Sequence, residues 1–243
     1  MKTRRFPFSL WLAALPVFAA LVALGVWQVN RLAWKEGLLA EIHARIAAPA
    51  EPVEALDARH AASGDVDYFP LVAKGVYCHD LERHFLSTHK GEAGFFVYTP
   101  LVSADSRILF VNRGFVPYER KDAATRAEGQ VAGEVEVMGL ARDAPAAKPG
   151  FLVPENDTAK NVFYWKDIAA MAASAGLDST KLRPYFLDAG SASNPGGLPV
   201  GGVTLIDLPN SHLQYAGTWF GLAAVLAAIV GIMTARRMRS RQP

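Results

Sequence analysis

The chain has 243 residues, of which 51% are hydrophobic and 20% are charged, and its formal net charge is +2. Its mean hydropathy of +0.13 is high for a soluble domain and low for a transporter with many spans. A few membrane spans joined to a folded domain are therefore expected. The small net charge also argues against nucleic acid as a partner.

Two long uncharged segments lie near the ends of the chain, at residues 6–30 and 208–235. Each is longer than the roughly 20 residues that an α-helix needs to cross about 30 Å of hydrocarbon. No other segment of the chain approaches this length without a charge. We therefore predict transmembrane helices over residues 8–29 and 212–235.

Charge predicts how these two helices are oriented. Basic residues precede the first helix and follow the second, and all 23 acidic residues lie between the two uncharged segments. Because basic flanks stay in the cytoplasm, we expect cytoplasmic tails at residues 1–7 and 236–243 and a periplasmic domain over residues 30–211. The basic tails would also contact anionic membrane lipid. This arrangement predicts a two-pass protein of the bacterial inner membrane.

The first uncharged segment could instead belong to a cleaved signal peptide. It follows basic residues, and Phe18-Ala19-Ala20 offers small residues to a peptidase. Against cleavage, the segment is long and continues into a helical pattern without a turn signal. Trp27, Arg31 and Trp34 fall on one helical stripe, and the pattern ends near Pro49. We therefore expect an uncleaved helix that extends beyond the membrane.

The middle of the chain predicts an α+β domain. Short segments rich in β-branched and aromatic residues, which are typical of strands, alternate with glycine and polar turn signals. These segments cover residues 71–77, 84–88, 95–102, 108–112, 134–140 and 186–187. Helices are expected at 53–59, at 118–128 and from the capping residue Asp167 to Ala175, whereas 144–157 has the composition of a loop. Together they predict a mainly antiparallel sheet, which could curl into a barrel, with peripheral helices.

The sequence lacks the common catalytic and nucleotide-binding signatures. It contains no GxxxxGK[ST], no GxGxxG after a strand, no GxSxG and no HExxH. The single cysteine, Cys78, excludes an intrachain disulfide and a CxxC metal site. His79, His84 and His89 are spaced five apart, which fits one face of neither a strand nor a helix, so solvated histidines are expected there rather than a metal site. No residue pattern therefore predicts an enzyme.

His212 is the candidate ligand of the second uncharged segment. On a helix it shares one face with Tyr215, Ala216, Trp219 and Ala223. A neutral imidazole at this position could coordinate a haem iron, with the two aromatic side chains packed on the ring and the alanines leaving space for it. The alternative is an aromatic belt at the membrane surface with no ligand, and spacing alone favours the belt.

The opposite face of the same predicted helix carries a stripe of small residues, Gly217, Gly221, Ala224 and Ala228. Such a stripe permits close approach of another helix. That helix could be the first span of the same chain or a span of a partner membrane protein. The sequence does not distinguish these two interpretations.

Two arginines are candidate contacts for an anionic group. Arg31 lies between Trp27 and Trp34 on the stripe of the first helix, which predicts a cation–π contact and a headgroup anchor. If a haem were bound nearby, Arg31 or Arg113 could contact its propionates.

Several short motifs occur in order along the chain. They are Leu24-Gly25-Val26-Trp27-Gln28, Gly75-Val76-Tyr77, Thr99-Pro100-Leu101, Asn112-Arg113-Gly114, His212-Leu213-Gln214-Tyr215-Ala216 and Thr218-Trp219-Phe220. In this order, and between two membrane spans, they resemble the motifs of the surfeit locus protein 1 family.

The resemblance implies an assembly factor for haem–copper cytochrome c oxidase, and therefore a protein that is not an enzyme. It implies that the chain binds haem a and assists its delivery into oxidase subunit I, with haem a synthase as a further partner. His212 matches the position of the haem ligand in this family. The rival interpretation is a membrane scaffold that stabilises subunit I during assembly and binds no haem itself.

Overall fold

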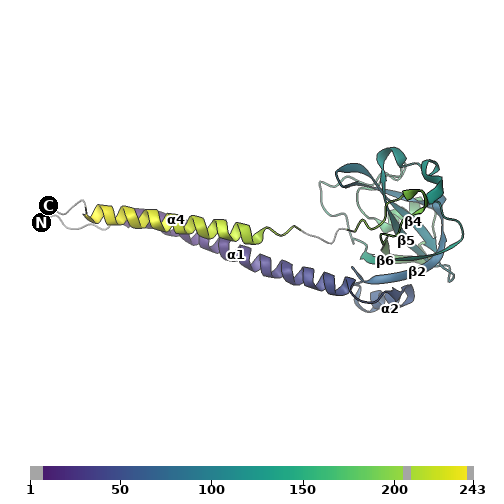
Figure 1. The fold of residues 1–243 in the computed structure, drawn as a ribbon, viewed down its shortest axis with the longest axis horizontal. Helices are drawn as coiled ribbons and strands as arrows, with labels where there is room; N and C mark the ends of the chain where they lie inside the picture. Colours follow the sequence, from purple (N-terminus) through teal and green to yellow (C-terminus); the bar gives the residue numbers. More distant parts are fainter. Residues whose placement is uncertain (1–7, 205–208, 240–243) are drawn as a thin grey trace. The chain divides into compact units, whose positions relative to one another are not determined.

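The computed structural model describes residues 8–204 and 209–239, so the predicted tail at 1–7 and the end of the tail at 236–243 lie outside the described residues. The chain divides into two compact units (Figure 1). One contains residues near both termini, Met1–Glu41 and Asp207–Pro243, and the other is a domain over Ile42–Ile206.

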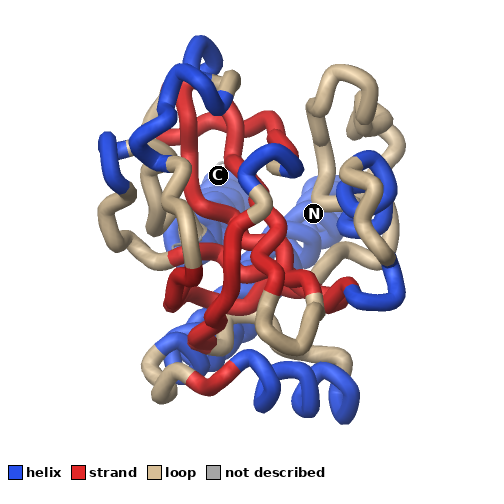
Figure 2. The backbone as a smooth tube through the Cα atoms, turned by 90° about the vertical axis from the view of Figure 1, so that its right-hand side faces the viewer, coloured by secondary structure: helices blue, strands red, loops and turns tan. Residues whose placement is uncertain are grey.

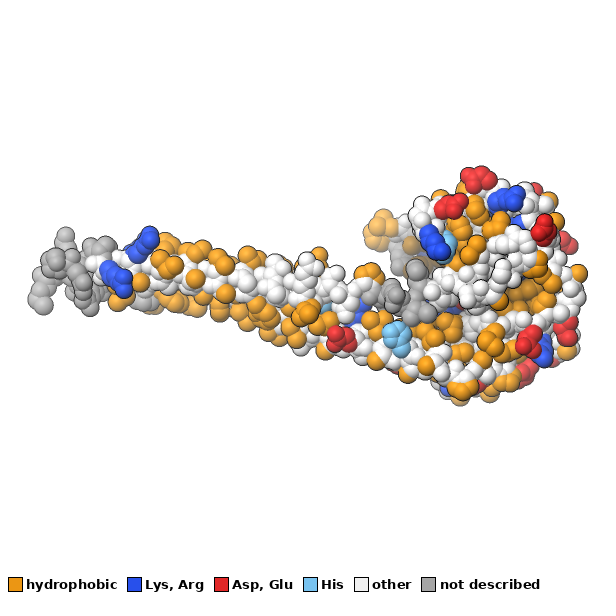
Figure 3. All heavy atoms as spheres, viewed as in Figure 1, with side chains coloured by type: hydrophobic (Ala, Val, Ile, Leu, Met, Phe, Trp, Pro, Cys, Tyr) orange, Lys and Arg blue, Asp and Glu red, His pale blue; other side chains and the backbone are white. Residues whose placement is uncertain are grey.

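Both predicted membrane spans are helical. Helix α1 covers Phe8–Ile46 and helix α4 covers His212–Arg239, and both are long and apolar enough to cross a membrane. Figure 3 shows hydrophobic side chains spread over the exposed surface of these helices, as a lipid environment would require. The continuation of α1 to Ile46 confirms the prediction that the first helix extends well past residue 31.

The domain between them is a closed five-stranded barrel. Its strands are β2 (Pro70–Tyr77), β4 (Glu92–Val102), β5 (Ile108–Pro117), β6 (Glu134–Asp143) and β7 (Leu182–Ala189). They pair in the order β2-β6-β7-β5-β4, and β4 returns to β2 to close the barrel (Figure 2). All of these pairs are antiparallel except β5–β7. The α+β prediction with a mainly antiparallel, barrel-like sheet is therefore confirmed.

Barrel closure depends on a glycine in β2. A Cβ atom on Gly75 would lie only 2.4 Å from the carbonyl oxygen of Val102, the residue that pairs with Val76 where β2 meets β4. Any larger residue at Gly75 would have to push the two strands apart. Gly75 therefore allows the close backbone approach at which the barrel closes.

Short elements surround the barrel. They are β1 (Glu51–Pro52), β3 (Arg83–His89), α2 (Val53–Ser63), α3 (Ile168–Ser174) and five 3₁₀ turns, η1 (His79–Leu81), η2 (Tyr118–Arg120), η3 (Ala123–Gly129), η4 (Ser179–Lys181) and η5 (Pro195–Gly197). The predicted cap of α3 is present, since Asp167 Oδ1 accepts a hydrogen bond from the Ala170 amide at 2.9 Å.

Two predicted elements differ from the structure. The single helix expected at 118–128 is replaced by η2 and η3, because the backbone is extended at Asp122 (ψ 124°), the cap of η3. Inside η3, Arg126 also leaves the helical backbone region (φ −139°), and its buried side chain bonds to Glu82. Strand β5 runs five residues past its predicted end at Asn112. Polar Asn112 and Arg113 interrupt the apolar pattern in the sequence, yet both side chains are buried in the barrel domain.

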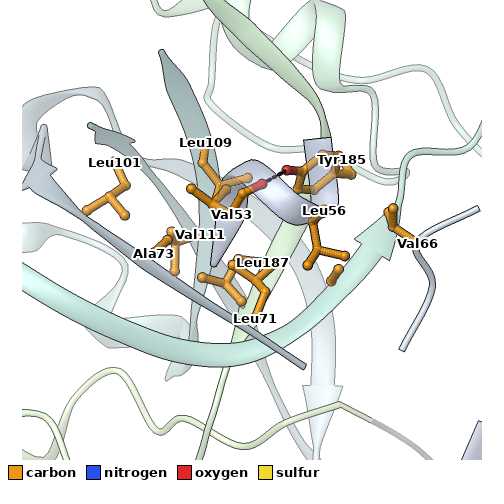
Figure 4. Close-up of a cluster of buried hydrophobic side chains, with 11 residues drawn as sticks. Val53, Leu56, Val66, Leu71, Ala73, Leu101, Leu109, Val111, Tyr185 and Leu187 are labelled. Atoms are coloured by element: carbon orange, nitrogen blue, oxygen red, sulfur yellow. Dashed lines mark hydrogen bonds between the residues drawn. The ribbon is translucent and has the colours of Figure 1, made fainter. Parts of the chain in front are cut away.

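Helix α2 contributes to the main hydrophobic core. Leu56, which is fully buried, lies among side chains of the barrel strands that include Leu71 and Leu187 (Figure 4). Tyr185 of β7 also joins this core, and its hydroxyl donates to Asp57 Oδ1 at 2.6 Å and lies 3.4 Å from the Val53 carbonyl oxygen. Apolar burial and these hydrogen bonds together hold α2 against the barrel.

Candidate functional site

The two long helices meet along one face of α1, at the end of the pair where α4 begins. His212 is the first residue of α4, and its ring Nδ1 lies 2.7 Å from Oε1 of Gln28. The Lys35 ammonium donates to the carbonyl oxygen of Pro209, just before α4. A Cβ on Gly25 would lie 2.6 Å from the Phe220 ring, so that ring packs directly on the glycine. The three α1 residues recur at the spacing of one helical face.

His212 is half-buried, and both apolar and polar residues lie beside it on α4. Leu213 and Tyr215 next to it on α4 are 68% and 55% exposed, and Trp219 is half-buried. Ala216 and Ala223, on the His212 face of α4, are each only 3% exposed. The space predicted beside these two alanines is therefore filled, because that face packs within the helix pair. Open apolar surface near His212 lies beside Tyr215 instead.

The small-residue stripe of α4 does not pack on α1. A Cβ added to Gly217 or Gly221 would meet no atom within 4 Å, and Ala224 and Ala228 are exposed. The interpretation that this stripe packs against the chain's own first span is therefore wrong. Gly25 of α1 takes that role, with the Phe220 ring against it. Docking of a partner helix on the stripe stays a prediction.

The predicted cation–π contact of Arg31 is present. The guanidinium carbon of Arg31 lies 3.8 Å from the centre of the Trp34 ring, and both side chains are exposed. Arg31 therefore presents a positive charge on the surface of α1, three residues from Gln28 along the helix. A contact with a haem propionate stays a prediction.

Arg113 occupies a different environment, in the barrel domain. It is 2% exposed, and its guanidinium donates to the carbonyl oxygen of Gly129 and to Oδ1 of Asn194 at 3.3 Å. It also lies 4.8 Å from the centre of the Tyr77 ring and 3.3 Å from Nδ1 of His79. Burial lowers the pKa of Arg113. Through these contacts, Arg113 attaches Gly129 and Asn194 to strand β5. The predicted contact of Arg113 with a haem propionate stays a prediction.

The histidines of the barrel domain are mostly engaged. His84 is 6% exposed and its Nε2 lies 3.1 Å from Glu82 Oε1, so the expectation of a solvated histidine is wrong at that position. His79 Nε2 donates to the Val131 carbonyl at 2.9 Å. Among residues 8–204 and 209–239, no group of three His, Cys, Asp or Glu side chains could hold a metal ion.

Glu82 forms the centre of this buried polar cluster. It accepts hydrogen bonds from His84 and from Arg126, whose side chain is also buried. Burial alone would raise the pKa of Glu82, but the bonds from His84 and Arg126 outweigh it and hold the pKa below its ordinary value. This cluster could not be predicted from the sequence, because nothing in the spacing of Glu82 and Arg126 indicates that they meet.

Comparison with known proteins identifies the family to which this chain belongs. The family model described as SURF1 family matches residues 15–224, which include Gln28, Arg31, Arg113 and His212. The chain belongs to the SURF1 family. The resemblance noted in the sequence is thereby confirmed.

Individual SURF1 relatives agree with this assignment. The chain is 35% identical over 227 residues to surfeit locus protein 1 of Rattus norvegicus, covering 85% of this chain and 69% of the relative. It is 34% identical over 240 residues to surfeit locus protein 1 of Homo sapiens, covering 89% and 74%. A SURF1-like protein of Monosiga brevicollis is 34% identical over 234 residues, covering 91% and 86%. Membership in the SURF1 family implies that the chain is an assembly factor for cytochrome c oxidase.

The geometry adds one residue to the predicted site. In the sequence Gln28 is one residue of a family motif, and in the structure it is the hydrogen-bond partner of His212. A signal for it was available, since it is a polar residue inside a long uncharged segment and a buried polar group requires a partner. Of the predicted residues, His212 and Arg31 lie in the helix pair with Tyr215 and Trp219, whereas Arg113 lies in the barrel domain.

Proposed function

We propose that this chain binds haem a at the end of the α1–α4 pair where α4 begins and assists its delivery into subunit I of a haem–copper terminal oxidase. The observation that carries the proposal is His212, half-buried beside exposed apolar side chains and held by Gln28, in a member of the SURF1 family. An ionisable residue at the end of an apolar helix is a functional candidate by default.

The donor chemistry of the site fits a haem iron. Among the described residues, the imidazole of His212 makes one hydrogen bond, through Nδ1, so Nε2 is available to an external ligand. Haem iron is commonly held by a histidine nitrogen. The exposed Leu213 and Tyr215 side chains offer apolar surface to a macrocycle, and Arg31 offers a positive charge to an anionic substituent.

A single histidine suits a carrier that must release its cargo. When bound, haem a supplies the iron and the macrocycle that the oxidase requires. The residues of this chain provide one axial nitrogen, an apolar surface and a nearby cation, and Gln28 holds the imidazole in place. One ligand is easier to displace than two, so transfer to a site with stronger coordination can be downhill.

The topology belongs to the same proposal. We place both termini in the cytoplasm, the domain over residues 30–211 in the periplasm and the two helices in the bacterial inner membrane. The three arginines in the last turn of α4 support this orientation through the positive-inside rule. Oxidase subunit I would then receive haem a at the periplasmic side of the membrane, with haem a synthase as the donor and lipid around both helices.

The test is His212→Ala in the full chain, purified from cells that make haem a. We expect the wild type to copurify with a Soret absorbance and the variant to lose it, because the histidine that lies beside Gln28 is gone. His43→Ala is the matched control, since His43 is exposed near the end of α1 and should retain haem. Full haem retention by His212→Ala, with an unchanged spectrum, would show that His212 is not the ligand.

A scaffold that stabilises subunit I without binding haem is the second candidate. The open stripe of α4 favours it, since a Cβ on Gly217 or Gly221 would have no described atom within 4 Å, and a partner helix could therefore pack there. Gly217→Leu should then reduce the amount of subunit I that copurifies, and leave the haem content unchanged. Equal recovery of subunit I with the variant and the wild type would argue against this candidate.

A further inference from the structure

The hydrogen bond between α1 and α4 determines which nitrogen of His212 carries the proton. Oε1 of Gln28 lies 2.7 Å from Nδ1 of His212. An amide oxygen has lone pairs but no hydrogen, so Nδ1 must be the donor. A neutral imidazole has one N–H, and Nε2 is then left with a free lone pair.

We propose that Gln28 is a positioning residue that holds His212 as the Nδ1–H tautomer, with Nε2 directed to the ligand. The inference rests on the proposed function only for the identity of that ligand, haem a. The tautomer itself is a property of the protein without haem.

The surroundings of Gln28 explain why the bond is maintained. Gln28 is half-buried in a segment of α1 that has no charged residue from 6 to 30. A polar amide in apolar surroundings costs free energy unless it is hydrogen-bonded, so His212 stabilises Gln28 as Gln28 orients His212. No other hydrogen bond of the Gln28 side chain is present within the described part of the chain.

Two further contacts set the position of α4 along the axis of α1. Three residues before Gln28, Gly25 packs against the Phe220 ring, and seven residues after it, Lys35 bonds to the Pro209 carbonyl. These contacts lie on both sides of the Gln28–His212 bond and on the same face of α1. These contacts hold the start of α4 next to Gln28 and keep the imidazole within hydrogen-bonding distance of the amide.

Holding the tautomer has a consequence for ligand binding. A histidine that donates its second ring N–H to an oxygen is oriented and made more basic as a metal ligand, and loss of such a partner typically costs about 10–100-fold in metal affinity. If the Gln28 amide were rotated, its NH₂ group would donate to Nδ1 and the proton would lie on Nε2. His212 could then bind iron through Nε2 only after losing that proton. The two orientations of the Gln28 amide thus predict opposite tautomers of His212, with the proton on Nδ1 in one and on Nε2 in the other.

The experiment reads the tautomer without haem. The full chain, labelled with ¹⁵N-histidine and reconstituted free of haem in nanodiscs, is examined by long-range ¹H–¹⁵N correlation. We expect wild-type His212 to show a protonated Nδ1 and an unprotonated Nε2. A proton on Nε2 in the wild type overturns the proposal, and this measurement requires no variant.

Variants then connect the tautomer to haem a binding. Gln28→Leu removes the acceptor and should release the Nε2–H form and weaken haem a binding by about 10–100-fold. Gln28→Glu keeps an acceptor and should restore the Nδ1–H form and the affinity. Gln214→Leu is the matched control on the exposed surface of α4 and should change neither. Wild-type haem affinity or an unchanged tautomer in Gln28→Leu contradicts the role of Gln28.

Failure of the proposed function can be told apart from failure of this inference. If His212→Ala retains haem in full, His212 is not the ligand, yet the haem-free spectra still show whether Gln28 sets the tautomer. If His212→Ala loses haem but Gln28→Leu binds it as tightly as the wild type, His212 is the ligand and Gln28 does not position it.

Discussion

Polar side chains are held differently in the barrel domain and in the helix pair. In the barrel domain Asp57 is the centre of a network and has several partners, Arg183, Arg107 and Tyr185. In the helix pair, His212 has one partner, Gln28, and one ring nitrogen without a partner among the described residues. A saturated network stabilises a fold, whereas an unsaturated side chain can bind something else. This difference supports our proposal of ligand binding in the helix pair, whereas the Asp57 network stabilises the barrel domain.

The largest expected effect breaks a network of the barrel domain. Asp57→Ala removes the carboxylate that lies 3.1 Å from Nε of Arg183, a side chain that is 1% exposed. Removing one partner of a buried ion pair costs about 3–5 kcal/mol, and the remaining contact of Arg183 with Asp105 places our expectation near the lower value. The measurement is the free energy of unfolding in urea. Asp80→Ala, at an exposed position, is the control. A loss as small as in that control would show that the network is not structural.

A second prediction concerns the contact between the helices. Gly25→Ala places a Cβ 2.6 Å from the Phe220 ring, so one helix or the ring must move. Overpacking of this kind typically costs about 1–3 kcal/mol. It can be measured by SDS titration with tryptophan fluorescence, since four of the five tryptophans lie in α1 and α4. Phe220→Leu should restore stability to Gly25→Ala, and a variant pair without this rescue would disprove the contact.

Acid should destabilise the barrel domain through Glu82. The pKa of this carboxyl is lower in the folded chain than its ordinary value of 4.5, so its ionised form stabilises the fold. That stabilisation is complete above the unfolded pKa and is lost as the pH falls through the lower folded pKa. Stability of the wild type should therefore fall as the pH drops below about 4.5, and Glu82→Gln should show a shallower fall. Parallel pH profiles would contradict a role for Glu82.

The smallest expected effect lies on the surface of α1. The exposed Arg31–Trp34 pair should contribute about 0.5–1 kcal/mol, as cation–π contacts at exposed sites do. A double-mutant cycle with Arg31→Ala and Trp34→Ala, measured by the same SDS titration, gives this coupling free energy. A coupling free energy of zero would show that the contact between Arg31 and Trp34 does not stabilise the protein.

Several features of the fold could be predicted from the sequence because their signals are local. The two uncharged segments predicted α1 and α4, and segments rich in β-branched and aromatic residues predicted strands close to β2, β4 and β6. Asp167 predicted the start of α3 through its capping side chain. The predictions failed where a side chain finds a distant partner. The helix expected at 118–128 is interrupted at Asp122 and again at Arg126, whose side chain reaches Glu82, 44 residues earlier in the chain.

The candidate site also has features that local patterns predicted and features that depend on packing. His212 and the aromatic residues beside it could be identified from helical spacing and from the family motifs, because a helix has a fixed period. The spacing did not show that Ala216 and Ala223 are covered, or that Gly217 and Gly221 are open. Those facts depend on how α4 is rotated against α1, and the packing of Phe220 on Gly25 is one of the contacts that set this rotation.

By itself, the sequence of this SURF1 family member determined the two apolar helices, the barrel-like domain between them and His212 as the candidate ligand. These follow from hydropathy, periodicity and motif, which are properties of neighbouring residues. Only the tertiary structure decided that Gln28, 184 positions away in the chain, meets His212. A hydrogen bond between two helices depends on their distance and rotation, and these are set by packing along the whole pair rather than by any local pattern.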